Sequence, residues 1–137
     1  FSAQDASGAA RIAEAIAEAV EQGRMPRPAV LIENLTEFTG GEAEQVLDRL
    51  IRAVVRADGF VVGEAESSTW SQAWLLAQPF KAARRGLLLT PGEADGDTLF
   101  GTPLGRIKRA DFPPGRGFLI DRGRARRIQT ATPGAAR

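Results

Sequence analysis

Glu33 is the residue whose position points most directly to chemistry. It follows four apolar residues, Ala29–Ile32, in a segment bounded by proline and polar residues. A short apolar run of this kind is typical of a strand buried on both faces. Open α/β sheets bind ligands at the carboxyl ends of their strands, so a carboxylate here can serve a ligand site. A solvated acid after a buried strand is equally common, and this short motif leaves both interpretations open.

The amino-acid composition excludes several kinds of chemistry. The chain has 137 residues and contains no cysteine, histidine or tyrosine. Disulfides, thiolate or imidazole metal sites, cysteine nucleophiles and Ser-His-Asp triads are therefore excluded. Proton transfer would depend on carboxylates or on Lys81 and Lys108. The absence of cysteine agrees with a cytoplasmic protein.

The elements before and after Glu33 follow from hydrophobic periodicity. Apolar residues recur every four positions from Ile12 to Val20, which predicts a helix over residues 8–22, with Asp5 or Ser7 as its cap. A second apolar stripe predicts a helix over residues 42–57. The next apolar segments predict a buried strand at 60–62 and a third strand at 87–89. Between them we expect a third helix that is capped by residues 67–69 and carries Trp70, Trp74 and Leu75.

The order of these elements predicts the class of fold. Helix and strand alternate three times with short connections, which is typical of a parallel α/β sheet with helices on its faces. Pro79 should kink or end the third helix. Beyond Thr90, glycine and proline punctuate a loop-rich stretch, and apolar segments on both sides of Gly123 predict a closing β-hairpin. We expect no second domain.

Charge is distributed unevenly along the chain. Residues 1–50 carry four basic and nine acidic side chains, whereas residues 106–137 carry nine basic and two acidic ones. The basic tail could bind nucleic acid, an acidic protein surface or the acidic first third of another copy, or it could be a solvated edge. No signal peptide precedes the first helix, and no apolar run is long enough to span a bilayer, so we expect no membrane insertion by this segment.

Three stretches of the sequence resemble FtsK/SpoIIIE-family P-loop ATPases, including the actinobacterial EccC ATPases of type VII secretion. The resemblance covers nearly the whole chain, and the third stretch is the most specific. The stretches are Val30–Leu35 followed by a long helix, Phe60–Thr69, and Ala82–Pro91 continuing through Asp95-Gly96-Asp97 to Pro113–Ile120.

The resemblance implies a fold and an activity. The fold would be a partial RecA-like (P-loop NTPase) three-layer α/β structure with a mainly parallel sheet. One domain would comprise a lead helix and linker at 1–27, a Walker B-like core at 28–90 and a basic loop and hairpin tail at 91–137. The parent would be a cytoplasmic, possibly membrane-associated ATPase that binds ATP and Mg²⁺, forms a homo-oligomeric ring and moves DNA or a secreted protein.

The resemblance also assigns roles to individual residues. Glu33 falls at the Walker B acid that holds Mg²⁺ through the nucleotide, and Asn34 at the second acid, where an amide cannot accept a proton. Glu64 and Glu66 fall where the family keeps a polar sensor of the γ-phosphate; the alternative is a pair of solvated acids. Three arginines are candidates for contacts to a neighbour's nucleotide: Arg84, Arg85 and Arg116. Arg84 and Arg85 could instead interact with the dipole of the preceding helix.

The chain departs from the family at one decisive point. It contains no G-x-x-x-x-G-K-[ST] sequence, so the phosphate-binding loop would lie upstream of Phe1 in a missing N-terminal half. We therefore expect the chain alone to be inactive and to hold no nucleotide. The alternative is a degenerate, non-hydrolysing module that serves assembly, regulation or docking of a secretion substrate.

Overall fold

The computed structural model describes residues 5–131, which form a mixed helical and stranded structure in two compact units. Unit 1 comprises residues 1–79 and unit 2 residues 80–137. Each unit has its own sheet: two parallel strands in unit 1 and three antiparallel strands in unit 2. No helix within 5–131 has the length and apolar character needed to cross a membrane.

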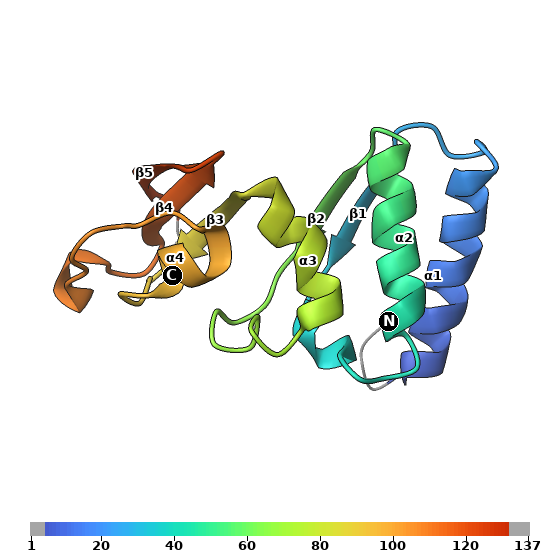
Figure 1. Cartoon of the computed structure of the whole chain (residues 1–137), viewed down its shortest axis with the longest axis horizontal. Helices are drawn as coiled ribbons and strands as arrows, with labels where there is room; N and C mark the ends of the chain where they lie inside the picture. The colour runs from blue at the N-terminus through green and yellow to red at the C-terminus, as the bar shows by residue number, and fades with distance from the viewer. Residues whose placement is uncertain (1–4, 132–137) are drawn as a thin grey trace, which may run out of the picture. The chain divides into compact units, whose positions relative to one another are not determined.

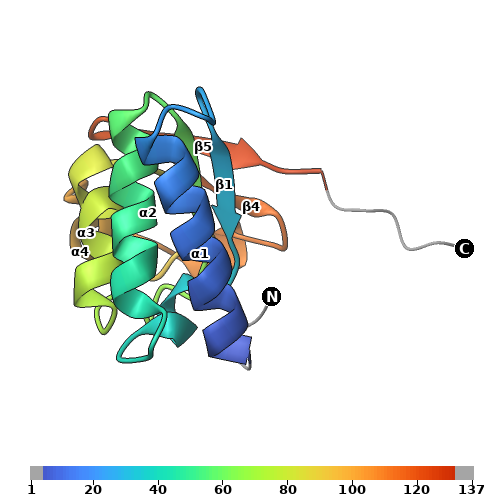
Figure 2. The same ribbon diagram turned by 90° about the vertical axis from the view of Figure 1, so that its right-hand side faces the viewer.

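Unit 1 has two long helices on one face of a two-stranded parallel sheet, and it also includes a 3₁₀ turn and the start of a third helix (Figure 1). Helices α1 (Ala6–Glu21) and α2 (Glu44–Arg56) lie side by side, as a second view also shows (Figure 2). Strands β1 (Ala29–Ile32) and β2 (Phe60–Gly63) pair in register, with Ile32 opposite Gly63. The expected helices and strands of this region are confirmed within two residues at each end.

Local chemistry explains where α1 begins and how it packs. The Asp5 side chain accepts a hydrogen bond from the Gly8 amide over 3.0 Å, so Asp5 is the cap, whereas Ser7 donates to Glu42. Small residues on one face of α1, Ala13 and Ala17, are 3% and 0% exposed. Side chains of this size permit close approach to α2, which contributes the larger core residues Leu47, Leu50, Ile51 and Val54.

The expectation that β1 and β2 are buried on both faces is wrong. Val30 and Ile32 point toward the helices, but on the opposite face Leu31 is 71% exposed and Phe60 67% exposed. A strand alternates its side chains between two faces, and within the described residues no layer covers the second face. The apolar run thus identified the strands correctly but overestimated their burial.

The third helix begins later than expected. Residues 67–72 form turns, in which Thr69 Oγ1 donates to the Glu66 carbonyl instead of capping a helix. Helix α3 (Trp74–Ala83) follows and crosses the boundary between the units. Pro79 lies inside α3 without ending it, and Trp74 is 71% exposed.

Unit 2 is an antiparallel sheet with strand order β3-β4-β5. The third strand therefore does not join a parallel sheet, which corrects the expectation of a mainly parallel one. The core of the unit contains Phe112, Phe118 and Ile120, with Phe100, Leu104 and Ile107 packed against it. Its elements are β3 (Arg85–Leu89), α4 (Asp95–Phe100), the 3₁₀ turn η3 (Arg109–Asp111), β4 (Arg116–Asp121) and β5 (Arg124–Gln129).

The closing hairpin is confirmed. Asp121 pairs with Arg124, which leaves a two-residue turn, and both of its residues have positive φ: 49° at Arg122 and 82° at Gly123. This backbone conformation matches the right-handed twist of the strands that it joins. Glycine adopts it without strain, which explains why Gly123 marked the turn.

Candidate functional site at the carboxyl ends of β1 and β2

Parallel pairing brings the predicted acids to one edge of the sheet. Glu33 follows Ile32 and Glu64 follows Gly63, and these two strand residues are register partners. The carboxyl ends of β1 and β2 therefore lie next to each other. Ligands bind at this edge in open α/β sheets, so a ligand site with Glu33 and Glu64 stays a prediction.

Backbone hydrogen bonds extend the pairing beyond the strands. The Glu64 amide donates to the Ile32 carbonyl over 2.9 Å, and the Leu35 amide donates to the Glu64 carbonyl over 2.8 Å. Leu35 is fully buried at the start of the 3₁₀ turn η2 (Leu35–Phe38). The segment after β1 is thus held firmly against the segment after β2.

Asn34 and Glu64 have direct structural roles at this edge. Asn34 has φ 47°, a left-handed conformation that asparagine tolerates better than most residues. Its backbone amide donates to Glu64 Oε2 over 3.2 Å. One oxygen of the Glu64 carboxylate therefore supports the turn after β1.

Glu33 and Glu64 are both exposed, and they differ in the partners of their carboxylates. In the part of the chain that the structure describes, no side chain or amide forms a hydrogen bond or ion pair with its carboxylate. Magnesium bound to a nucleotide typically has one or two carboxylates and several phosphate and water oxygens as ligands. A single free carboxylate fits that role, and Glu33 is the residue at this edge that could supply it.

Glu66 lies in the turns after β2. Its carbonyl accepts hydrogen bonds from the amide and the hydroxyl of Thr69, and Thr69 in turn lies 2.8 Å from Thr36 Oγ1. Its side chain is exposed. Across residues 5–131 no cluster of three or more acidic side chains could hold a metal by itself.

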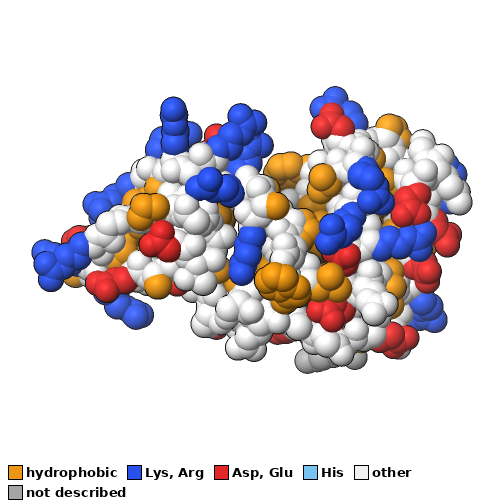
Figure 3. All heavy atoms as spheres, in the orientation of Figure 1, with side chains coloured by type: hydrophobic (Ala, Val, Ile, Leu, Met, Phe, Trp, Pro, Cys, Tyr) orange, Lys and Arg blue, Asp and Glu red, His pale blue; other side chains and the backbone are white. Residues whose placement is uncertain are grey.

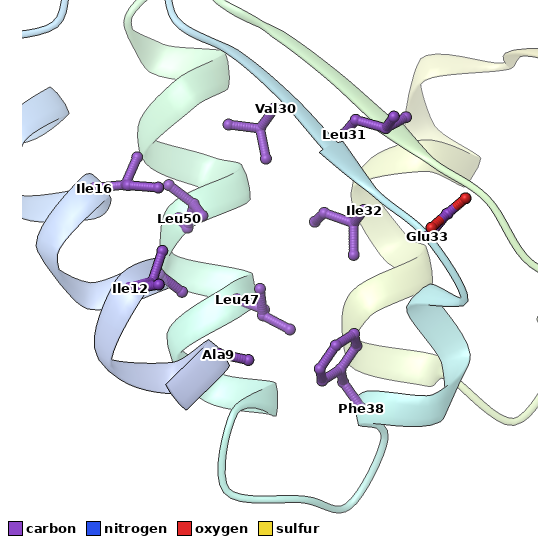
Figure 4. A pocket seen from close by; sticks show the side chains of 11 residues that line it. Ala9, Ile12, Ile16, Val30, Leu31, Ile32, Glu33, Phe38, Leu47 and Leu50 are labelled. Carbon is purple, nitrogen blue, oxygen red and sulfur yellow. The ribbon is translucent and has the colours of Figure 1, made fainter. Parts of the chain in front are cut away.

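An apolar cavity of about 250 Å³ lies beside β1, between the strand and the two helices. Figure 4 shows Ile12 and Ile16 of α1 and Leu47 and Leu50 of α2 facing the strand across it. Leu31 and Glu33 leave β1 on the other side. A cavity with this lining suits apolar side chains, and it offers no amide cradle for phosphates.

The cavity coincides with an unpaired strand edge. Among the described residues, β1 pairs with β2 alone, so its outer edge has no partner strand. Packed helices lie about 8–10 Å apart, whereas neighbouring strands lie about 4.8 Å apart. Two helices side by side therefore need a wider sheet than two strands provide, and α1 extends past β1 over the cavity.

The three candidate arginines all lie in unit 2 and all have partners there. Arg84 donates through Nη2 to the Gly101 carbonyl over 2.8 Å and through Nε to the Phe100 carbonyl over 3.2 Å. Its side chain therefore interacts with the end of α4, while its backbone amide donates to the Lys81 carbonyl at the end of α3 over 3.2 Å. Arg85 pairs with Asp121 over 2.6 Å, and Arg116 donates to Gln129 over 3.2 Å.

Sequence reasoning missed the cavity and the unpaired edge. The spacing of Ile12 and Ile16 indicated an apolar helix face, but a helix face does not reveal whether anything fills the space beneath it.

A scan of protein-family models finds no match to this chain, and searches of curated proteins and of solved structures find none either.

Proposed function

We propose that the chain is the C-terminal half of an FtsK/SpoIIIE-type ATPase domain, whose parent uses ATP to move DNA or a secreted polypeptide. The observation that carries this proposal is the parallel pairing of β1 and β2, which puts Glu33 and Glu64 at one carboxyl edge. P-loop ATPases hold the magnesium of the bound nucleotide with a carboxylate at such a strand end. Glu33, with its free carboxylate, takes that role.

The sheet of unit 1 is narrower than the helix layer that covers it, which supports the proposal that half of the domain is missing. A sheet of two strands leaves the outer edge of β1 unpaired and α1 without a strand beneath it. Parallel sheets normally have helices on both faces, whereas Leu31 and Phe60 lie exposed on the second face. Further strands at the β1 edge and a covering layer would complete a RecA-like three-layer fold and would bring the phosphate-binding loop.

The other roles follow from this assignment. Glu64 and Glu66 act at the sensor position, and Glu64 does so through the turn that it supports. In a ring of parent subunits, Arg84, Arg85 or Arg116 would reach a neighbour's nucleotide only after leaving the partners described above. The chain alone, without the phosphate-binding loop, is inactive.

A second candidate function is a non-hydrolysing module for assembly, regulation or docking of a secretion substrate. The observation in its favour is Asn34, which occupies the position of the water-activating acid. Its backbone amide donates a hydrogen bond to Glu64, and its side chain is an amide instead of a carboxylate. An amide side chain cannot act as a general base. Such a domain would bind MgATP without turnover.

The test is calorimetric titration of MgATP into the longer polypeptide that includes the residues before Phe1. We expect binding in the wild type and at least tenfold weaker binding in Glu33→Ala, since the metal loses a ligand. Glu37→Ala is the matched control, because Glu37 is an exposed acid on the neighbouring η2 and does not follow a strand directly. Equal affinity in all three proteins would refute the role of Glu33.

A further inference from the structure

The sheet of unit 2 has two different faces. Pairing in register puts Leu88, Phe118 and Ile120 on one face, where each is less than a tenth exposed and packs in the core. We call the opposite side the outer sheet face. It consists of Arg85, Leu87 and Leu89 from β3, Gly117, Leu119 and Asp121 from β4, and Arg124, Arg126 and Ile128 from β5.

The centre of the outer sheet face is apolar and open to solvent. Leu87 is 48% exposed, Leu89 45% and Leu119 38%. Leu87 and Leu119 are register partners, and Ile128, which is half-buried, extends the patch onto β5. Three leucines on β3 and β4, together with Ile128 on β5, form a contiguous apolar patch, which differs from singly scattered surface leucines and typically marks an interaction surface.

Arginines border this patch on one side. Arg126 lies opposite Leu119 on β5, and Arg124 lies one pleat further along the same face. Neither forms an ion pair within residues 5–131, whereas Asp121 is neutralised by Arg85 over 2.6 Å. The face is therefore apolar at its centre and positive along β5. Figure 3 shows Lys and Arg side chains on both units, while most visible Asp and Glu side chains lie on unit 1.

On the core face of the same hairpin, an arginine does have a structural partner. Arg127, on the other side of β5, lies over the rings of Phe112 and Phe118 at 5.2 and 5.9 Å. Its guanidinium thus covers the core of the unit and has a structural partner. Arg124 and Arg126 have no such partner, so their charge is available to another molecule.

We propose that the outer sheet face binds an acidic amphipathic helix of a partner protein. Three strands span about 10 Å between their outer axes, which matches the diameter of one helix, about 10–12 Å. The apolar stripe of such a helix would cover the three leucines, and carboxylates along one side of it would meet Arg124 and Arg126. Nucleic acid fits less well, because its phosphates would lie against leucines and no aromatic residue on this face could stack a base.

This inference does not rest on the ATPase proposal. It uses residues of unit 2 alone, whereas the proposed nucleotide role uses Glu33 in unit 1. Either proposal can fail while the other stands, because MgATP binding and helix binding are measured separately.

The experiment uses the full chain and a fluorescein-labelled synthetic helix of about 20 residues, long enough to cross the sheet. The helix has leucine at i, i+3, i+4 and i+7 and glutamate beside that stripe. We expect saturable binding by fluorescence anisotropy and methyl NMR shifts at Leu87, Leu89 and Leu119. The double variant R124E/R126E should weaken binding at least tenfold, since it reverses both free charges.

Two controls make the result specific. Arg106→Glu changes charge in the loop that packs on the core face and should leave affinity within about twofold of the wild type. A peptide with lysine in place of glutamate should bind at least tenfold more weakly. Equal binding of both peptides, or shifts confined to other residues, would overturn the proposal. So would a short DNA duplex that binds through Arg124 and Arg126 when the acidic peptide does not.

Discussion

The backbone amide of Asn34 donates a hydrogen bond to Oε2 of Glu64 over 3.2 Å. This contact joins the segments that leave two neighbouring parallel strands, thirty residues apart in sequence. It fixes the left-handed turn at Asn34 and keeps one Glu64 oxygen occupied, while Glu33 remains free. The same edge therefore contains one acid with a structural role and one available to a ligand.

We expect Asn34→Ala to destabilise unit 1 by about 1 kcal/mol, because alanine tolerates the left-handed conformation poorly. Asn34→Gly should stay within about 0.5 kcal/mol of the wild type. Urea unfolding followed by tryptophan fluorescence measures this directly, since both tryptophans, Trp70 and Trp74, lie in unit 1. Equal losses in the two variants would show that the turn conformation does not determine the effect.

Glu21 should make the contact between α1 and α2 sensitive to acid. The hydrogen bond from Arg49, together with the charges of Arg49 and Arg56, lowers the pKa of Glu21 below its ordinary value of 4.5. A lowered pKa in the folded state stabilises the fold above the unfolded value, and this contribution is lost as pH falls through the folded pKa. Glu21→Gln should therefore lose stability relative to wild type at pH 7, and the difference should shrink below about pH 4.5.

The matched control for Glu21 is Glu18→Gln. Glu18 lies on the same helix and forms no ion pair within residues 5–131, and its charge acts on Arg49 only at longer range. Urea midpoints measured from pH 7 to pH 3 should therefore diverge from wild type more for Glu21→Gln than for Glu18→Gln. High salt should reduce the Glu21 effect, because the pair is exposed and screened. A pH-independent Glu21→Gln difference would contradict this explanation.

Gly117 should be intolerant of any side chain. A Cβ at this position would meet the backbone carbonyl of Leu88 on the neighbouring strand. Gly117→Ala must therefore separate β3 from β4, and we expect a loss of more than about 2 kcal/mol. Gly92→Ala, where the nearest atom would be an Asp95 carboxylate oxygen at 3.3 Å, should cost less than about 0.5 kcal/mol. Amide hydrogen exchange at Phe118 and Ile120 would report both variants.

The open face of the β1–β2 sheet should cause the isolated chain to self-associate. Leu31 and Phe60 are the most exposed residues of this apolar face, and uncovered apolar area favours association. Sedimentation velocity should show a weight-average mass that rises with concentration, and Leu31→Lys/Phe60→Lys should remove that rise. A wild-type chain that stays monomeric at every concentration would show that this face needs no cover.

The sequence predicted the elements of this protein better than their assembly. Periodicity located α1 and α2, and the turn at Gly123 located the hairpin, because these signals are local in the chain. The pairing of β3 with β4 was not predictable in this way, since a run of leucines looks the same in a parallel and an antiparallel sheet. α4 was missed because six residues among glycines have too little periodicity to identify.

The candidate site was predictable in part for the same reason. An acid after an apolar strand indicated Glu33, and parallel pairing makes the neighbouring strand end its natural partner. The occupation of Glu64 by the Asn34 amide depends on a turn geometry that residue types alone do not reveal. The unpaired edge of β1 and the cavity beneath α1 arise because the sheet of unit 1, within the described residues, has no strand beyond β1. A local sequence pattern does not indicate how many strands a sheet contains.

Phosphate release by the longer polypeptide, with and without Glu33→Ala, shows whether the end of β1 belongs to an ATPase site. We expect ATP turnover in the wild type and its loss in Glu33→Ala, with Glu37→Ala unchanged, because Glu33 supplies the carboxylate for the metal of the nucleotide. Turnover that survives in Glu33→Ala, or no turnover in the wild type, would contradict an ATPase site at this strand end.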